Sequence, residues 1–266
     1  MSRRIIDFHT HPWVKHEDNI CAYRELMSGD PIETFHNDLM RAGITRAAGM
    51  PINTIGKDQP LEAQLEQLYT INNDALTVYR ALGDFYIPGM SIHPAFVRES
   101  CEEIERMYKA GVRLVGELVP YFCSWGQIGF VHEGMDEILD LIENYGMVVN
   151  FHSTNAREDE YAMVKAHPGI TFVGAHPGEK TAYMRHLAWM EEMPNYYLDL
   201  SGTGLFRHAM LTYGVGRVGA ERFLFGSDYP TCSPGMNVGG VEYTDISEAD
   251  KDLIFYGNAC RLLNIQ

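Results

Sequence analysis

The segment Met147-Val148-Val149-Asn150-Phe151 is an almost continuous apolar run. Such runs are typical of parallel β-strands that are covered on both faces, because neither face of the strand meets water. A second run, residues 171–175, follows after an amphipathic stretch. Strands that alternate with helical patterns in this way predict βαβ units and a parallel sheet.

The same alternation extends outward from this segment over the whole chain. Asp30 and Pro31, followed by Glu33, are the signals that begin a helix, and Gly111 is a typical helix end. Eight βα units predict a (β/α)₈ TIM barrel in one domain over residues 1–266, and an open doubly wound sheet would typically have fewer strands. The predicted strands are residues 4–8, 45–50, 86–91, 112–118, 147–151, 171–175, 196–200 and 223–225.

The bulk composition limits the class of partner. The formal net charge of −15 argues against a nucleic-acid partner, which needs clustered Lys and Arg, and leaves a small-molecule substrate as the expectation. The five cysteines form no CxxC pair, which favours reduced thiols in a cytoplasmic protein. The first residues lack the apolar core of a signal peptide, and no run approaches the ~20 apolar residues of a membrane helix. A homo-oligomer is left open.

Metal-binding residue types stand at the ends of several predicted strands. His9 and His11 are two residues apart, so in an extended strand both point the same way and can grip one cation. His152, His176 and Asp228 follow three other strands. Because the carboxyl ends of barrel strands meet at one face, these side chains should converge there. The pattern predicts a divalent metal site.

Four motifs carry a resemblance to a known family over nearly the whole chain. The sequence resembles the amidohydrolase superfamily, in the amidohydrolase-related branch of metal-dependent barrel hydrolases and of decarboxylases similar to aminocarboxymuconate-semialdehyde decarboxylase. The resemblance implies that His9, His11 and Asp228 bind metal, that His152 is a further ligand, and that His176 is a second-metal ligand or a catalytic residue. The motifs are Ile6-Asp7-Phe8-His9-Thr10-His11, Asn150-Phe151-His152, Gly174-Ala175-His176-Pro177 and Leu224-Phe225-Gly226-Ser227-Asp228-Tyr229-Pro230.

Glu117 ends the fourth predicted strand. Many members of the family have a lysine near this point, which is carboxylated in some of them and bridges two metals, and TatD-like deoxyribonucleases use a glutamate. Glu117 is therefore either a bridging ligand or a residue that faces the substrate, and the number of ions, one or two, stays open. Imidazoles with carboxylates favour zinc, and manganese and iron suit the same donors.

Four residues are candidates for substrate binding: His93, Tyr121, Trp125 and Asp199. Two loops, residues 121–125 and 232–240, are candidate pocket walls. The remaining histidines are expected at the surface, and these are His16, His36, His132, His167, His186 and His208.

Three functions compete. In a hydrolase of an amide, lactone or ester, the metal would activate water, Asp228 would take its proton, and the metal or His176 would polarise the attacked oxygen. In a non-oxidative decarboxylase of a small aromatic or unsaturated acid, the same ligands would hold the carboxylate, and Asp228 or His176 would protonate the carbon. A metal-loaded binding protein without chemistry is the third. Glu117, as a bridging acid, favours the hydrolase.

Overall fold

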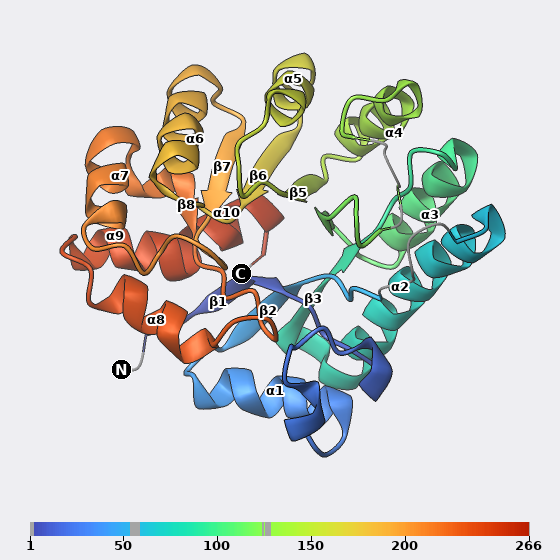
Figure 1. Ribbon diagram of the computed structural model, residues 1–266, viewed down its shortest axis with the longest axis horizontal. Helices are drawn as coiled ribbons and strands as arrows, with labels where there is room; N and C mark the ends of the chain where they lie inside the picture. Colours follow the sequence, from blue (N-terminus) through green and yellow to red (C-terminus); the bar gives the residue numbers. More distant parts are fainter. Residues whose placement is uncertain (1–2, 54–58, 124, 126–128, 266) are drawn as a thin grey trace.

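The computed structural model describes residues 3–53, 59–123, 125 and 129–265. Eight parallel strands form one sheet in the order β1 to β8, with helices between them, so the predicted TIM barrel is confirmed. The helices form an outer ring around the strands (Figure 1). The strands are β1 Ile6–Thr10, β2 Arg46–Gly49, β3 Tyr86–Met90, β4 Leu114–Leu118, β5 Val148–His152, β6 Thr171–Ala175, β7 Tyr196–Asp199 and β8 Phe223–Leu224.

The helices begin and end at recognisable signals. Asp30 caps α1, because its side chain accepts hydrogen bonds from the backbone N–H groups of Ile32 and Glu33, and Pro31 is the first helical residue, as predicted. The α-helices are α1 Pro31–Arg41, α2 Leu61–Leu82, α3 Val97–Lys109, α4 Glu133–Asn144, α5 Glu158–Ala166, α6 Lys180–Glu192, α7 Met210–Val218, α8 Pro234–Glu242, α9 Glu248–Asp252 and α10 Asn258–Leu263. Shorter helical turns are η1 His16–Asp18, η2 Arg24–Leu26, η3 Gly83–Phe85, η4 Ala220–Arg222 and η5 Leu253–Gly257.

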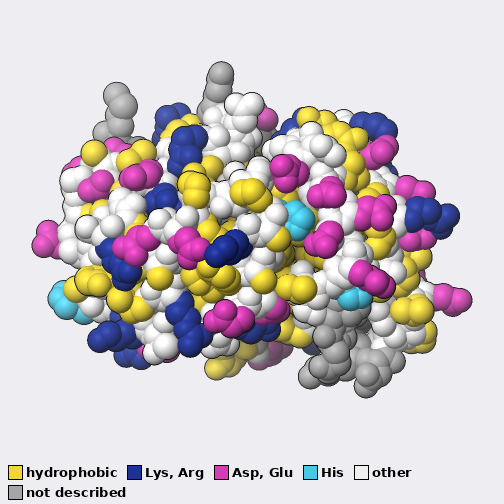
Figure 2. All heavy atoms as spheres, turned by 90° about the horizontal axis from the view of Figure 1, so that it is seen from above, with side chains coloured by type: hydrophobic (Ala, Val, Ile, Leu, Met, Phe, Trp, Pro, Cys, Tyr) yellow, Lys and Arg dark blue, Asp and Glu magenta, His cyan; other side chains and the backbone are white. Residues whose placement is uncertain are grey.

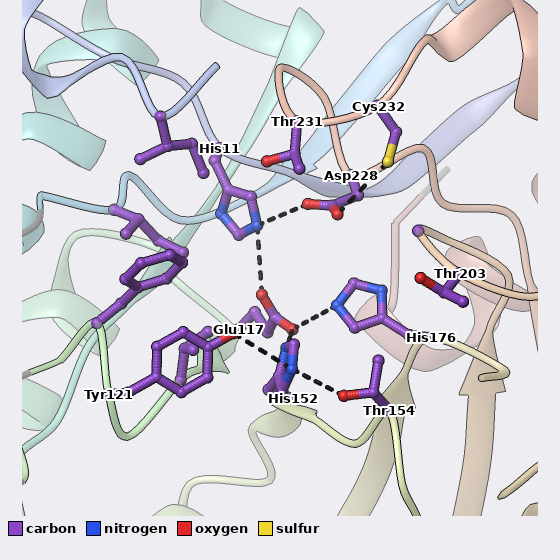
Figure 3. A pocket seen from close by; sticks show the side chains of 15 residues that line it. His11, Glu117, Tyr121, His152, Thr154, His176, Thr203, Asp228, Thr231 and Cys232 are labelled. Carbon is purple, nitrogen blue, oxygen red and sulfur yellow. Dashed lines mark hydrogen bonds and ion pairs between the residues drawn. The ribbon is translucent and has the colours of Figure 1, made fainter. Parts of the chain in front are cut away.

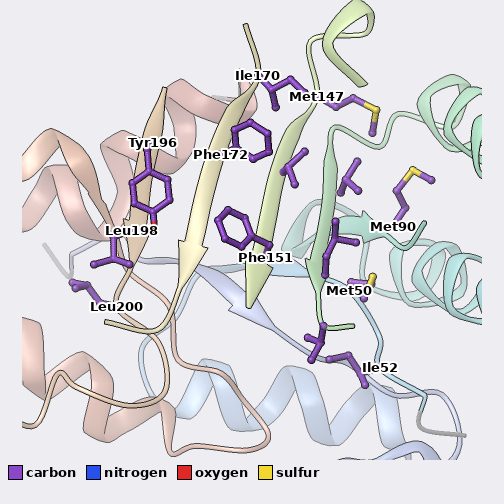
Figure 4. Packing of buried hydrophobic residues seen from close by; sticks show 14 of the residues in the cluster. Met50, Ile52, Met90, Met147, Phe151, Ile170, Phe172, Tyr196, Leu198 and Leu200 are labelled. Carbon is purple, nitrogen blue, oxygen red and sulfur yellow. The ribbon is translucent and has the colours of Figure 1, made fainter. Parts of the chain in front are cut away.

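The core has two parts. The larger part lies between the strands and the helix ring, where Phe151 packs against Phe172 and Tyr196 with ring centroids 6.2 and 6.3 Å apart (Figure 4). Burying each such side chain contributes about 1.5–3 kcal/mol. The smaller part includes Phe8 and Val148 on the strands together with Leu263 of α10. The two clusters together pack against both faces of the strands.

The barrel closes where β1 meets the segment that follows β8. The N–H of Phe8 donates to the carbonyl of Phe225 (2.8 Å), and the N–H of Asp228 donates to the carbonyl of His9 (2.9 Å). Thr10 also bridges Tyr229 in parallel register. This contact keeps β1 extended as far as Thr10, whereas the sequence predicted a strand over residues 4–8. We call this contact the closure seam, and it sets Asp228 beside His9.

The surface is mixed in charge on the face that Figure 2 shows, where acidic side chains are interspersed with Lys and Arg. Within the described residues, no helix combines the length and the apolar character that crossing a membrane requires.

The prediction of a surface position is wrong for His167, which is buried at the end of α5, and for His186. His186 is fully buried on α6. Its ring is held at both ends: Nδ1 lies 2.7 Å from the hydroxyl of Tyr196, and Nε2 lies 2.9 Å from the carbonyl of Ser153. The helical pattern alone did not reveal these polar partners. Burial lowers the pKa of His186 from 6.5 to about 4, although the bond to Ser153 raises it.

This shift makes the stability of the fold depend on pH. Native His186 stays neutral down to about pH 4, but the unfolded chain takes up a proton near pH 6.5. Stability is therefore full above pH 6.5 and falls as the pH drops towards 4, by about 3 kcal/mol in total. Urea unfolding at pH 7 and pH 4.5 should show a smaller pH dependence in His186→Gln than in the wild type. Replacing the exposed His208 by Gln is the matched control, and an equal effect in both variants would contradict the prediction.

Candidate metal centre

Four acceptor atoms converge at the carboxyl ends of the strands. Nε2 of His9 lies 3.1 Å from Nε2 of His11, and the two nitrogens are 3.2 and 3.3 Å from Oε2 of Glu117. Oδ1 of Asp228 lies 3.8 Å from the first nitrogen and 3.5 Å from the second. His9 lies on β1 and His11 directly follows it, while Glu117 lies on β4 and Asp228 in the loop after β8. Figure 3 shows how His11, Glu117 and Asp228 face one another. Residues far apart in the sequence thus meet at one point.

The two imidazole rings are oriented by hydrogen bonds at their other nitrogens. Nδ1 of His9 lies 2.9 Å from Oδ2 of Asp199, and Nδ1 of His11 lies 2.9 Å from the carbonyl oxygen of Met50. A carbonyl and a carboxylate can only accept, so both Nδ1 atoms must donate. In the neutral rings, both Nε2 atoms therefore present lone pairs to each other and to the carboxylates.

Such a cluster suits a cation. Lone pairs facing one another at these distances repel unless a positive charge lies among them. Ligand atoms bound at about 2.1 Å to one tetrahedral ion stand about 3.4 Å apart, which the observed 3.1 to 3.8 Å brackets. The anchoring of each ring through its second nitrogen is also usual for metal-binding histidines. The residues therefore fit a divalent metal.

The electrostatics of the cluster favour positive charge. Burial lowers the pKa of His9, but the charges of Asp199 and Glu117 outweigh it and raise that pKa well above its ordinary value. Burial likewise raises the pKa of Glu117, but His9 and His176 bring it well below its usual range. Glu117 is thus an ionised carboxylate in a site almost closed to water.

Glu117 joins this cluster to a second one. Its other oxygen, Oε1, lies 3.0 Å from Nδ1 of His152 and 3.1 Å from Nε2 of His176. The six residues predicted as ligands therefore all meet, but in two sets that share Glu117: His9, His11 and Asp228 around Oε2, and His152 with His176 around Oε1. A carboxylate that uses one oxygen toward each set is placed to bridge two ions.

Metal stoichiometry tests this role of Glu117. If the residue bridges two ions, elemental analysis of protein dialysed from excess metal should approach two ions per chain. Glu117→Gln should lower that number towards one, because the amide offers only one acceptor oxygen. A stoichiometry of one in the wild type would assign Glu117 to the orientation of His152 and His176.

The cluster forms the floor of a cavity of about 280 Å³. Ile20, Ile52, Val119 and Phe122 supply an apolar part of its lining. The polar part includes hydroxyl groups and one thiol, and Figure 3 shows these side chains around the ligands: Tyr121, Thr154, Thr203, Thr231 and Cys232. The described part of the lining contains no Lys or Arg.

Both predicted wall loops reach this cavity, through Tyr121 and Phe122 and through Cys232, although Ser124 lies outside the described residues. The structure does not bring His93 and Trp125 into the lining. Both are buried, with ring centroids 6.3 Å apart, and Nε1 of Trp125 donates to the carbonyl of Ile92 (3.2 Å).

Asp199 is also fully buried and holds His9 rather than lining the cavity. Its pKa is lowered, since the charge of His9 outweighs the effect of burial. Sequence reasoning missed Asn150 and Ser201, which both bond to Asp199. The signal for Ser201 was available, because it lies two residues after Asp199 and so points the same way along the chain.

The backbone places the two candidate proton carriers in an uncommon conformation. His176 and Asp228 have φ values of 71° and 62°, in the left-handed region. Such residues cost of order 1 kcal/mol or more and cluster at functional sites. At Asp228 the bond from its N–H to the carbonyl of His9 holds this conformation, so the closure seam aims the side chain.

A barrel with a buried metal-binding cluster on its carboxyl face defines a class of metal-dependent barrel enzymes. The amidohydrolase family profile matches residues 6–265, and the chain belongs to the amidohydrolase superfamily of enzymes.

A curated relative, the γ-resorcylate decarboxylase of Polaromonas sp. strain JS666, is 30% identical over 118 residues. The match covers 37% of this chain and 36% of that protein, so the chain aligns with about a third of the relative's length.

Two solved structures show the same fold. A 2,6-dihydroxybenzoate decarboxylase from Rhizobium has a TM-score of 0.75 at 16% identity, with 98% of this chain and 99% of that chain covered. A dihydroxybenzoic acid decarboxylase from Polaromonas sp. JS666, solved with bound manganese and 2-nitroresorcinol, has a TM-score of 0.71 at 15% identity, with 98% and 97% covered.

These comparisons overturn the prediction of a hydrolase. The curated relative is a decarboxylase, and so are the two structural relatives named above. The prediction rested on Glu117 as a bridging acid suited to a metal-bound hydroxide. That argument was not specific, because the same carboxylate also holds the rings of His152 and His176.

Proposed function

We propose that the protein is a divalent-metal-dependent, non-oxidative decarboxylase of a small aromatic or unsaturated carboxylic acid. The observation that supports the proposal is the cavity of about 280 Å³, whose lining combines His11 and Asp228 with an apolar wall. A planar acid fits this division, with its carboxylate on the polar floor and its ring or double bond against the wall. The resemblance to a γ-resorcylate decarboxylase supports it.

The cation, when bound, supplies a Lewis-acidic centre that holds anionic oxygens. The mixed donor set suits Zn²⁺, which the sequence favours, and Mn²⁺ or Fe²⁺ equally. His9 and His11 would hold it from one strand, with Glu117 and Asp228 as oxygen ligands. The apolar residues would fix the plane of the substrate and keep water from the reacting carbon.

The reaction requires one proton to replace CO₂. Asp228 or His176, in its protonated form, gives a proton to the carbon that carries the carboxylate. The carbon–carboxylate bond then breaks, its electron pair restores the π system that the protonation interrupted, and CO₂ leaves. The donor regains a proton from solvent, so the net change is the uptake of one proton and the release of one CO₂. Both side chains line the cavity, so both reach the space that the substrate would occupy.

The experiment is an assay of metal-loaded protein against hydroxybenzoic acids and unsaturated acids, with CO₂ release as the signal. In D₂O the product should carry one deuterium at the carbon that lost the carboxylate, which ties CO₂ release to proton transfer at that atom. A parallel panel of esters, amides and lactones should give no turnover. Turnover of that second panel without CO₂ release would contradict the proposal.

A further inference from the structure

A chain of buried hydrogen bonds runs beneath the cavity from Asp199 through Ser201 to His176. Oγ of Ser201 donates to Oδ1 of Asp199 in a short contact, and it lies 3.0 Å from Nδ1 of His176. Asp199 and Ser201 are fully buried, and His176 is 4% exposed. Water therefore does not compete for these bonds.

The charge of Asp199, at the end of this series of hydrogen bonds, determines which atom donates in each bond. Asp199 is surrounded by donors, namely the amide of Asn150, the backbone N–H of Ser201 and the ring of His9, as an ionised carboxylate requires. The hydroxyl hydrogen of Ser201 thus points to Asp199. The oxygen of Ser201 is left as an acceptor, so Nδ1 of His176 must donate to it.

The consequence for His176 is a fixed tautomer. With Nδ1 as the donor, the neutral ring keeps its lone pair on Nε2. That nitrogen faces Oε1 of Glu117 at 3.1 Å, and the ring lines the cavity. The nitrogen that faces the cavity is therefore the one whose lone pair is available to a cation or a proton.

The backbone next to Ser201 lies close to the ring of His176. Gly202 has a φ of +59°, and a Cβ at this position would lie 2.4 Å from Nδ1 of His176. A side chain there would displace the ring from Ser201. The turn after β7 thus lies against Nδ1 of His176, the nitrogen that Ser201 contacts.

His9 shares this network but does not depend on Ser201. Its Nδ1 lies 3.1 Å from Oγ of Ser201, but it also has a direct partner in Oδ2 of Asp199 at 2.9 Å. Loss of the Ser201 hydroxyl therefore leaves the orientation of His9 in place, while His176 loses its only side-chain acceptor at Nδ1 among the described residues. Mutation of Ser201 can therefore test the role of His176 separately from that of His9.

We propose that Ser201 is a positioning residue, which transmits the negative charge of Asp199 to His176 and fixes the ring as the Nδ1–H tautomer. Only the kinetic part of its test rests on the proposed decarboxylase reaction. The spectroscopic and metal-binding parts require no turnover.

The spectroscopic test compares the wild type with Ser201→Ala, both labelled with ¹⁵N in the histidine rings and loaded with one equivalent of Zn²⁺, so that a second ion at His152 and His176 does not itself fix the tautomer. The signals of His176 are assigned by their loss in His176→Gln. At alkaline pH, where the ring is neutral, the wild type should show a protonated Nδ1, and Ser201→Ala should populate the Nε2–H form. An unchanged tautomer in Ser201→Ala would overturn the proposal. Ser201→Cys keeps a weaker acceptor, should give an intermediate population, and replaces Ser201→Ala if that variant does not fold.

Metal affinity and kinetics provide the second test. Ser201→Ala should bind Zn²⁺ within about threefold of the wild type, whereas Asp199→Asn, which removes the partner of His9, should weaken binding by about 10–100-fold. In Ser201→Ala, kcat should fall by about 10–100-fold with little change in KM. Ser100, also fully buried and bonded to the backbone of His93, supplies the matched control Ser100→Ala, which should change none of these values.

The outcomes are distinguishable. Equal loss of metal affinity in Ser201→Ala and Asp199→Asn would overturn the separate role of Ser201. If the wild type decarboxylates nothing, the proposed function fails, and the tautomer and metal-binding comparisons still decide the role of Ser201.

Discussion

Asp228→Asn is expected to lower kcat by about 10²–10⁴-fold, the usual contribution of a general acid or base. Asparagine keeps the shape of the side chain and one oxygen that can reach the cation. The backbone bond from residue 228 to the carbonyl of His9 is unaffected by the change. His9 and His11 should therefore still hold a metal, and what is lost is a carboxyl group able to carry a proton to the substrate.

Measured metal content is the control that separates the two roles of Asp228. The variant must be assayed at full occupancy, and Asp140→Asn, which changes an exposed carboxylate on α4, should retain wild-type activity. If Asp228→Asn binds metal and turns over at the wild-type rate, Asp228 is a ligand only. The proton would then move through His176, and the effect of Ser201→Ala on kcat should be correspondingly large.

Removal of the metal is expected to abolish activity and to leave the barrel folded. A bound cation contributes several kcal/mol of charge stabilisation, so the metal-free protein should lose at least about 10³-fold in rate. The packed clusters around Phe151 and Phe8 contain none of the metal-binding side chains, so the far-ultraviolet circular dichroism should be unchanged. The Tm should rise by about 5–10 °C when metal is restored at a hundred times its Kd.

The measurement is activity after exhaustive dialysis against a strong chelator, followed by titration with Zn²⁺, Mn²⁺ or Fe²⁺. Recovery with one ion at its stoichiometric amount would identify the metal. Full activity in protein that elemental analysis shows to be metal-free would rule out the metal-dependent reaction. Loss of the fold on chelation would show that the metal is structural as well.

The strands and the convergence of the ligands could be predicted because both follow from repeated patterns. Apolar runs such as residues 171–175 mark strands, and His9, His11 and Asp228 stand at strand ends, which always meet in a barrel. Boundaries were harder to predict, as at β1, because the closure seam extends that strand through bonds to residues far away in the sequence.

The wrong predictions concern positions where the direction of a side chain after the end of its strand decides whether it reaches the cavity. His93 follows β3, as His152 ends β5, yet His93 is directed into the core beside Phe96 and Trp125. Spacing carries no information about this choice. The role of Ser201 and the burial of His186 were missed for a related reason. Both depend on a buried hydrogen-bond partner, and the local sequence does not identify that partner.

The closure seam affects when the metal site can form during synthesis and folding. Oδ1 of Asp7 accepts a hydrogen bond from the N–H of Ser227, across a sequence separation of 220 residues. Contacts of such high contact order form late, because the entropy of closing the loop must be overcome first. A polypeptide still emerging from the ribosome has His9 and His11 long before it has Asp228. The complete set of ligands therefore exists only when synthesis has passed Asp228 and the ring of strands has joined.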